Sequence, residues 1–258
     1  MTDVNELIKM KIVCIGGRET SAIKGIALKG LEALDIIDID SSVQSNRESI
    51  IDSLSDTDLI FIVTAMDSAT DTSVAGLVAE CSRDIGALTI GVVVESHAFN
   101  LLEWKNHSGI EKLTRLVDTT MVITKEQLCS LVKSIYGLIT KPELINIDFS
   151  NIRSVLRDSG YALMGSATVC GENLIAIALQ TVLDSQPLQA SFHKARRVLI
   201  SITSAEKNLE ITEVLSATSN VQEMLHQDAN MIFGTSFDET MSESVRVTVI
   251  ATDFDYKK

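Results

Sequence analysis

The sequence predicts an α/β protein: a doubly wound, mostly parallel sheet joined by a helix to an α+β second half with a mixed sheet. Two observations lead to this prediction. In the first half, short apolar runs alternate with helical patterns, which is typical of a parallel sheet covered on both faces. In the second half, a strand with clean apolar–polar alternation follows helices and shorter apolar runs, which indicates a half-buried strand in a mixed sheet.

The candidate strands of the first half are apolar runs separated by helical patterns. They cover residues 11–17, 33–40, 58–64, 86–95 and 119–124. Helices are expected between them, at about 21–31, 47–54, 74–86 and 101–117. Ligands of parallel sheets bind at the carboxyl ends of the strands, so a site is expected at the turns after Ile15, Asp38, Thr64 and Val94.

A longer helix is expected over 125–141, because apolar residues recur along one of its faces. They are Leu128, Leu131, Val132, Ile135 and Leu138. Further helices are expected around 151–158, 172–184 and 210–225, and strands at 196–203, 229–238 and 244–254. In the last strand valines alternate with Arg246 and Thr248, which predicts one buried and one solvent-facing side.

Composition excludes several classes of function. The net charge of −13 repels phosphate backbones and anionic membranes, so neither nucleic-acid binding nor direct membrane binding is expected. The cysteines Cys14, Cys81, Cys129 and Cys170 form no CxxC pair, which favours buried free thiols in a reducing compartment. The polar N-terminus and short apolar runs predict a cytoplasmic protein. The histidines have no ligand spacing, so no metal site is expected.

Several stretches resemble FtsZ, the bacterial tubulin-like cell-division GTPase. The second half is similar to its C-terminal domain over "LINIDFSNIRSVLRDSGYALMGSATVCGEN" (144–173), "DANMIFGTSFDE" (228–239) and "ESVRVTVIATDF" (243–254). The first half matches in outline, through "KIVCIGG", "DTDLIFIVTAM" and "GALTIGVVVE". The resemblance implies a tubulin/FtsZ-like fold with a GTPase-like domain at 1–124, a shortened central helix and linker at 125–143, and a C-terminal domain at 144–258.

The first phosphate loop of that family is a run of glycines ending in Asn-Ala. The corresponding "CIGGRETSAI" retains Gly16, Gly17 and Ala22, but Arg18, Glu19 and Thr20 stand where glycines are expected. Side chains there fill the space in which backbone amides approach phosphate. The alternative is a simple capped turn, with Thr20 or Ser21 starting the next helix.

The family's signature loop reads G-G-G-T-G-T-G, and "DSATDTS" (67–73) aligns with it on Thr70 and Thr72. Every signature glycine is replaced, two of them by Asp67 and Asp71. These carboxylates would repel a triphosphate, although carboxylates can also hold Mg²⁺ beside phosphate. The simpler interpretation is that the aspartates cap the following helix.

Two family elements are shortened as well. Only about 18 residues separate Asp40 from Asp58, where the family has a long loop that covers the γ-phosphate. The helix after "MVI" keeps only the later part of the family's central helix, without the Asn and Asp that grip guanine. We therefore expect no cofactor, and GTP only if the chain is a divergent GTPase.

The loop "NIDFSN" resembles the family's synergy loop, Asn-x-Asp-x-x-Asp, which enters the nucleotide pocket of the next subunit. Asn146 and Asp148 match, and Asn151 replaces the last acid. An amide is no base, which argues against a hydrolytic role. Either the loop caps the next helix, or it contacts a partner.

The sequence thus leads to two main hypotheses. In the first, the chain is an FtsZ-like pseudo-GTPase, not an enzyme, which modulates or caps filaments by contacting another FtsZ-family protein or a second copy of itself. In the second, it is a divergent cell-division GTPase that still binds GTP and polymerises. A new small-molecule site in the vacated pocket is a third possibility. The chain ends soon after the last strand, at "DFDYKK", without the tail through which FtsZ reaches membrane adaptors.

Overall fold

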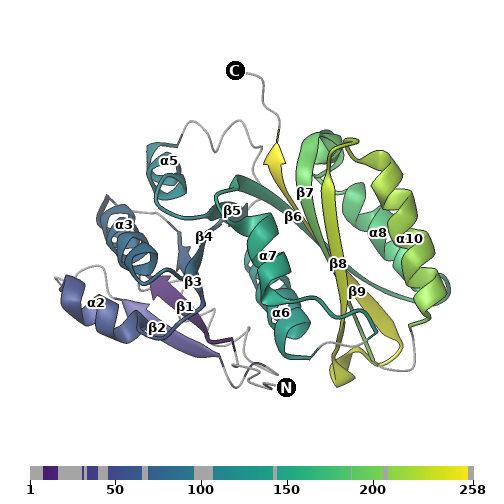
Figure 1. The fold of residues 1–258 in the computed structure, drawn as a ribbon, viewed down its shortest axis with the longest axis horizontal. Coiled ribbons are helices and arrows are strands. Elements are labelled where there is room, and N and C mark those ends of the chain that lie inside the picture. Colours follow the sequence, from purple (N-terminus) through teal and green to yellow (C-terminus); the bar gives the residue numbers. More distant parts are fainter. Residues whose placement is uncertain are drawn as a thin grey trace, which may run out of the picture.

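The computed structural model describes residues 8–16, 31, 34–39, 46–65, 69–95, 107–141, 144–186, 188–205 and 209–254. Within these ranges one nine-stranded sheet runs through the molecule, in the order β2-β1-β3-β4-β5-β6-β9-β7-β8 (Figure 1). The predicted helix at 21–31 lies outside the described residues, apart from Leu31.

The first five strands are parallel, as predicted. They are β1 (Met10–Ile15), β2 (Asp35–Ile39), β3 (Leu59–Thr64), β4 (Leu88–Val94) and β5 (Thr119–Ile123). Every residue of β3, β4 and β5 is buried, because helices pack on both faces of this part of the sheet. One face is covered by α2 (Arg47–Leu54), α3 (Ala69–Asp84) and α5 (Ser108–Thr114). The other is covered by α6 (Lys125–Thr140) and α7 (Phe149–Leu156).

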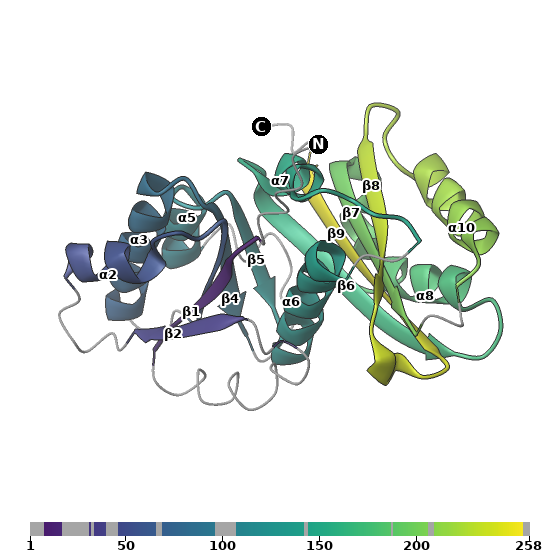
Figure 2. The same ribbon diagram turned by 60° about the horizontal axis from the view of Figure 1, so that its bottom comes forward.

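The last four strands form the predicted mixed part of the sheet. They are β6 (Gly160–Cys170), β7 (Ala195–Ser204), β8 (Asn230–Phe237) and β9 (Ser244–Phe254). Strand β9 is antiparallel to both β6 and β7, whereas β7 and β8 are parallel. Helices α8 (Leu174–Leu183) and α10 (Ile211–Met224) cover one face (Figure 2). The short elements are α9 (Leu188–Ser191), η1 (Phe192–Lys194) and η2 (Glu239–Met241).

Helix α6 connects the two parts. Thr124 and Gln127 form a capping box at its start, with the Thr124 N–H donating to Gln127 Oε1 at 2.9 Å. Its 16 residues span about 24 Å. The helix begins after the end of β5 and ends beside the end of β8, where the Phe237 N–H donates to Lys141 O. All five apolar residues predicted for its buried face are buried. The parts of the sheet also meet directly, because β5 pairs with the start of β6 over two residue pairs.

Some expectations from the sequence were wrong. Strand β6 was not predicted, and α3 begins at Ala69 instead of about residue 74. Helix α5 ends at Thr114 rather than at 117, and the predicted part at 101–106 lies outside the described residues. Strand β9 is not half-buried: Thr248 is only 1% exposed, because α6 covers the polar side of the strand.

In the described part of the chain, no helix is long and apolar enough to cross a membrane.

Candidate functional site

The first candidate site lies at the carboxyl ends of β1 and β3. Ile15 pairs with Thr64, so the carboxyl ends of β1 and β3 lie next to each other. Gly16 directly follows β1 and has a φ of +94°, a backbone conformation that favours glycine. Gly17, Ala22 and Asp67 lie outside the described residues.

Asp71 is the charged group next to this glycine. It lies in the first turn of α3, four residues before the fully buried Ala75, and is itself only 8% exposed. Its Oδ1 is 3.4 Å from the position that a β-carbon on Gly16 would take, and the nearest described atoms there all belong to its carboxyl group. A carboxylate is favourable at a helix N-terminus. Here it lies where an anionic ligand of the strand ends would be expected.

The two threonines that define the signature-loop alignment flank Asp71 on the helix. Thr70 is exposed. The Oγ1 of Thr72 lies 3.1 Å from the β-carbon position of Gly109 in α5, so this side chain packs at the α3–α5 contact. Of the residues predicted for this site, the structure therefore places Asp71 beside Gly16, with Thr72 next to another helix.

The second candidate site is the loop at 146–151, which begins beside β8, the last strand of the sheet. Asp148 occupies the N-cap position of α7, and its N–H donates to Asn151 Oδ1 at 2.9 Å. Asn146 and Asp148 are exposed, and the Arg153 guanidinium lies 5.1 Å from the centre of the Phe149 ring. The predicted helix cap is confirmed, with Asn151 engaged in it.

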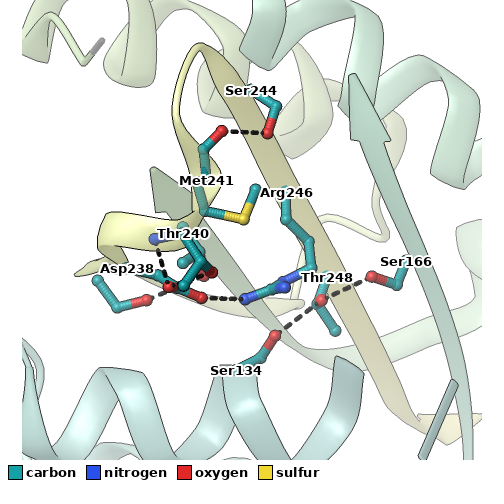
Figure 3. A network of polar contacts seen from close by, with 10 residues as sticks. Ser134, Ser166, Asp238, Thr240, Met241, Ser244, Arg246 and Thr248 are labelled. Atoms are coloured by element: carbon teal, nitrogen blue, oxygen red, sulfur yellow. Dashed lines mark hydrogen bonds and ion pairs between the residues drawn. The ribbon is translucent and has the colours of Figure 1, made fainter. Parts of the chain in front are cut away.

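A polar network that the sequence did not reveal connects α6 with the mixed part of the sheet (Figure 3). Ser134 of α6 donates to Thr248 Oγ1 at 2.8 Å, and Ser166 of β6 lies 3.0 Å from the same oxygen. Beside them, Arg246 pairs with Asp238 at 3.5 Å, and the Thr240 hydroxyl donates to Asp238 Oδ1 at 2.6 Å. The only sequence signal was the alternation in β9, which was taken to mark solvent exposure.

The local environment shifts the pKa values of this ion pair. Burial lowers the pKa of the Arg246 guanidinium, and the neighbouring carboxylate opposes that effect. Burial acts to raise the pKa of Asp238, but hydrogen bonds from Thr240 and the charge of Arg246 outweigh it, so the pKa is lowered.

Thiol and metal chemistry find little support in the part of the chain that the structure describes. All four cysteines are free, but only Cys14 and Cys81 are buried, and Cys170 is exposed against expectation. Burial raises the pKa of the Cys81 and Cys129 thiols, which makes them less reactive. No group of three or more His, Cys, Asp and Glu side chains within the described ranges could hold a metal ion.

Comparison with solved structures identifies the fold. The chain is similar to an empty FtsZ dimer from M. jannaschii, at 26% identity and a TM-score of 0.79, with 96% of this chain and 89% of that chain covered. The FtsZ W319Y mutant from M. jannaschii matches at 24% identity and a TM-score of 0.80, covering 96% and 91%. CetZ from Methanosaeta thermophila strain DSM 6194 matches at 13% identity and a TM-score of 0.67, with 94% of this chain and 86% of that chain covered. The predicted tubulin/FtsZ-like fold is thereby confirmed.

A family model sharpens this assignment. The model of the FtsZ family, C-terminal domain, matches residues 160–255, which include β6, β7, β8 and β9. This part of the chain is thus similar to the C-terminal domain of the FtsZ family. Together with the structural matches, it supports the FtsZ/tubulin-like family for this chain.

Proposed function

We propose that this chain is an FtsZ-like pseudo-GTPase, which acts by contacting other proteins rather than by hydrolysing GTP. The observation that carries the proposal is the buried Asp71 carboxyl group against Gly16, at the joined ends of β1 and β3. The proposal divides the chain into a degenerate GTPase-like domain at 1–124, a central helix and linker at 125–143, and a C-terminal domain at 144–258.

The electrostatic cost of a phosphate at this position supports the proposal. Two like unit charges about 4 Å apart repel each other by about 4 kcal/mol at an effective dielectric constant of ~20. Asp71 is almost entirely shielded from solvent, so water screens little of that repulsion. The carboxylate also takes the favourable position at the N-terminus of α3 that a phosphate would otherwise use.

The loop at 146–151 is the proposed contact surface. Asn146 and Asp148 are exposed there, while the Asn151 amide is held in the helix cap. One similar protein is described as an FtsZ dimer, which supports an FtsZ-family protein or a second copy of this chain as the partner. Such a contact would let the chain modulate or cap an FtsZ-type filament. The surface at the carboxyl ends of β1 and β3, where the nucleotide site is degenerate, would not receive a further subunit.

Nucleotide binding tests the first part of the proposal. We expect no saturable GTP binding by calorimetry and no GTP-dependent rise in melting temperature for the natural chain. Asp71→Asn removes the charge at nearly constant volume, so this variant should bind GTP better than the natural chain does. Asp52→Asn on the exposed side of α2 is the matched control and should not. Micromolar GTP binding by the natural chain would overturn the proposal in favour of the divergent GTPase that still binds GTP and polymerises.

Sedimentation with an active FtsZ tests the contact surface. We expect an equimolar amount of this chain to change the pelleted mass or the filament length. Asn146→Ala should abolish that effect, whereas Asn220→Ala, an equally exposed amide on α10, should leave it unchanged. If the natural chain leaves mass and length unaffected, and does not associate with itself, the contact hypothesis is wrong.

A further inference from the structure

A small cavity opens between the second half of α6 and the mixed part of the sheet. Its described walls come from the second half of α6 and Lys141, the ends of β7 and β8 with Asp238, the start of β9, and Leu31 from the first half of the chain. The free space amounts to about 40 Å³. A water molecule needs roughly 10–15 Å³ of such space, so the cavity has room for about three oxygen-sized groups.

The charge of this cavity is opposite to that of the protein. Lys133, Lys141 and Arg246 line it, and Asp238 is the one acidic side chain among the described lining residues. This excess of positive charge occurs in a chain whose net charge is −13. Tyr136 lies on the same walls and its hydroxyl can donate a hydrogen bond, whereas the Ser236 hydroxyl already pairs with Thr203 Oγ1 at 2.9 Å.

Arg246 has more donor capacity than its neighbours use. Its side chain is 12% exposed, and its Nε is fully shielded from solvent without a hydrogen-bond partner. Figure 3 shows the guanidinium held beside Asp238 by one edge. Because Nε is shielded from the cavity as well, only the terminal nitrogens of the guanidinium remain to donate to a group in it.

The two lysines are less engaged, although the positive charge of Lys133 helps to lower the pKa of Asp238. Within the described ranges, the ammonium groups of Lys133 and Lys141 make no hydrogen bond or ion pair. Asp238 neutralises only part of this charge, because it is one carboxylate among three cationic side chains. The donors that remain are cationic or hydroxyl groups around one small space.

We propose that this cavity binds a small oxyanion, a carboxylate or a phosphate group, between Lys133, Lys141 and Arg246. Planar Arg and mobile Lys donors are the usual partners of both groups. The site is independent of the proposed lack of GTP binding, since it lies at the other end of α6 from the strand-end turns. A bound anion would link α6 to β9 through charge-assisted hydrogen bonds.

Anion-dependent stabilisation of the full-length chain tests the proposal. Inorganic phosphate and acetate are titrated separately, with sodium chloride keeping the ionic strength constant, and the melting temperature and binding heat are measured. We expect saturable binding of at least one of the two anions. Tighter phosphate binding assigns a phosphate group as the ligand, and tighter acetate binding assigns a carboxylate.

Two variants locate the binding. Lys133→Met with Lys141→Met should weaken the anion at least tenfold, whereas the exposed pair Lys112→Met with Lys194→Met, which changes the net charge equally, should not. Arg246→Lys keeps the charge but removes the planar guanidinium, and should also weaken binding; if this variant does not fold, the lysine pair decides. Absence of saturable binding to the natural chain, or equal affinity in the cavity and surface variants, would overturn the proposal.

Discussion

The two faces of the mixed part of the sheet are both buried but differ in chemistry. The face under α8 and α10 is apolar: Val198, Ile200 and Ile202 of β7 pack there with the valines of β9. The face under α6 and α7 is mixed: it carries Ser201 and Thr203 of β7 and Arg246, Thr248 and Thr252 of β9, together with the buried Leu199 and Ile250. Burial and hydrophobicity therefore separate in part here, because buried polar side chains are interspersed with apolar contacts on one of the faces.

This difference has an energetic consequence. Each buried apolar side chain gains the free energy of leaving water, about 1.5–3 kcal/mol for a Val or Ile. A buried hydroxyl pair contributes only about 0.5–1.5 kcal/mol net. We therefore expect substitutions on the apolar face to have the larger effects, and the following predictions are ordered from the largest expected change to the smallest.

Ile200→Ala should cause the largest loss of stability. Ile200 is fully buried on the apolar face, and truncation of a buried Ile costs about 2–5 kcal/mol. The free energy of unfolding from urea denaturation measures it. Ile211→Ala, at a residue that is 49% exposed on α10, is the matched control and should change stability by about 0.5 kcal/mol or less. Equal losses at both positions would contradict the comparison.

Gly137→Ala should destabilise the contact between α6 and β8. A β-carbon there would lie 2.9 Å from Ser236 Oγ, and such overpacking costs about 1–3 kcal/mol. Because Ala favours a helix over Gly by about 1 kcal/mol, the net loss is expected at the lower end of that range. In α3 the nearest atom to a β-carbon on Gly76 is at 3.4 Å, so Gly76→Ala should be neutral or stabilising. A stabilising Gly137→Ala would show that the two elements can separate freely.

Ser134→Ala should cost about 0.5–1.5 kcal/mol, the usual net value of one hydrogen bond. It removes the donor to Thr248 Oγ1, which keeps its contact with Ser166. A double-mutant cycle with Thr248→Val isolates the pairwise energy. A coupling energy close to zero would mean that the hydroxyl network contributes nothing to the attachment of α6.

Ser201→Ala should have the smallest effect, at a position adjacent to Ile200 but on the opposite face. Ser201 is 3% exposed and its Oγ has no hydrogen-bond partner. Because an unsatisfied buried hydroxyl is itself unfavourable, its removal should leave stability unchanged or raise it slightly. A loss comparable to that of Ile200→Ala would contradict the assignment of the two faces.

The sequence predicted most of the fold because its apolar periodicities are strong. The five residues on one side of α6 and the continuous apolar runs of β3 and β4 left little ambiguity. Strand β6 was missed because small residues interrupt its pattern and its second half is only partly buried. The start of α3 was placed too late because Asp71 and its neighbours resemble a turn, although an acid is also favourable in the first turn of a helix.

The candidate sites were predictable only in part. Alignment identified Gly16 and the loop at 146–151, but the burial of Asp71 against Gly16 depends on the register between β1 and β3. The cationic cavity combines α6 with β9, more than a hundred residues apart in sequence, so local patterns cannot reveal it. Alternation in β9 showed that Arg246 faces away from the valines. It could not show that a helix covers that side.

The segment that follows α6 has a consequence for assembly. The Thr235 N–H donates to Ile145 O at 3.0 Å, and the Phe237 N–H to Lys141 O at 3.1 Å. These bonds satisfy two outer N–H groups in the second half of β8, the last strand of the sheet. A β-strand added there by another molecule would have to displace this segment. Extension of the sheet is therefore hindered along the second half of β8.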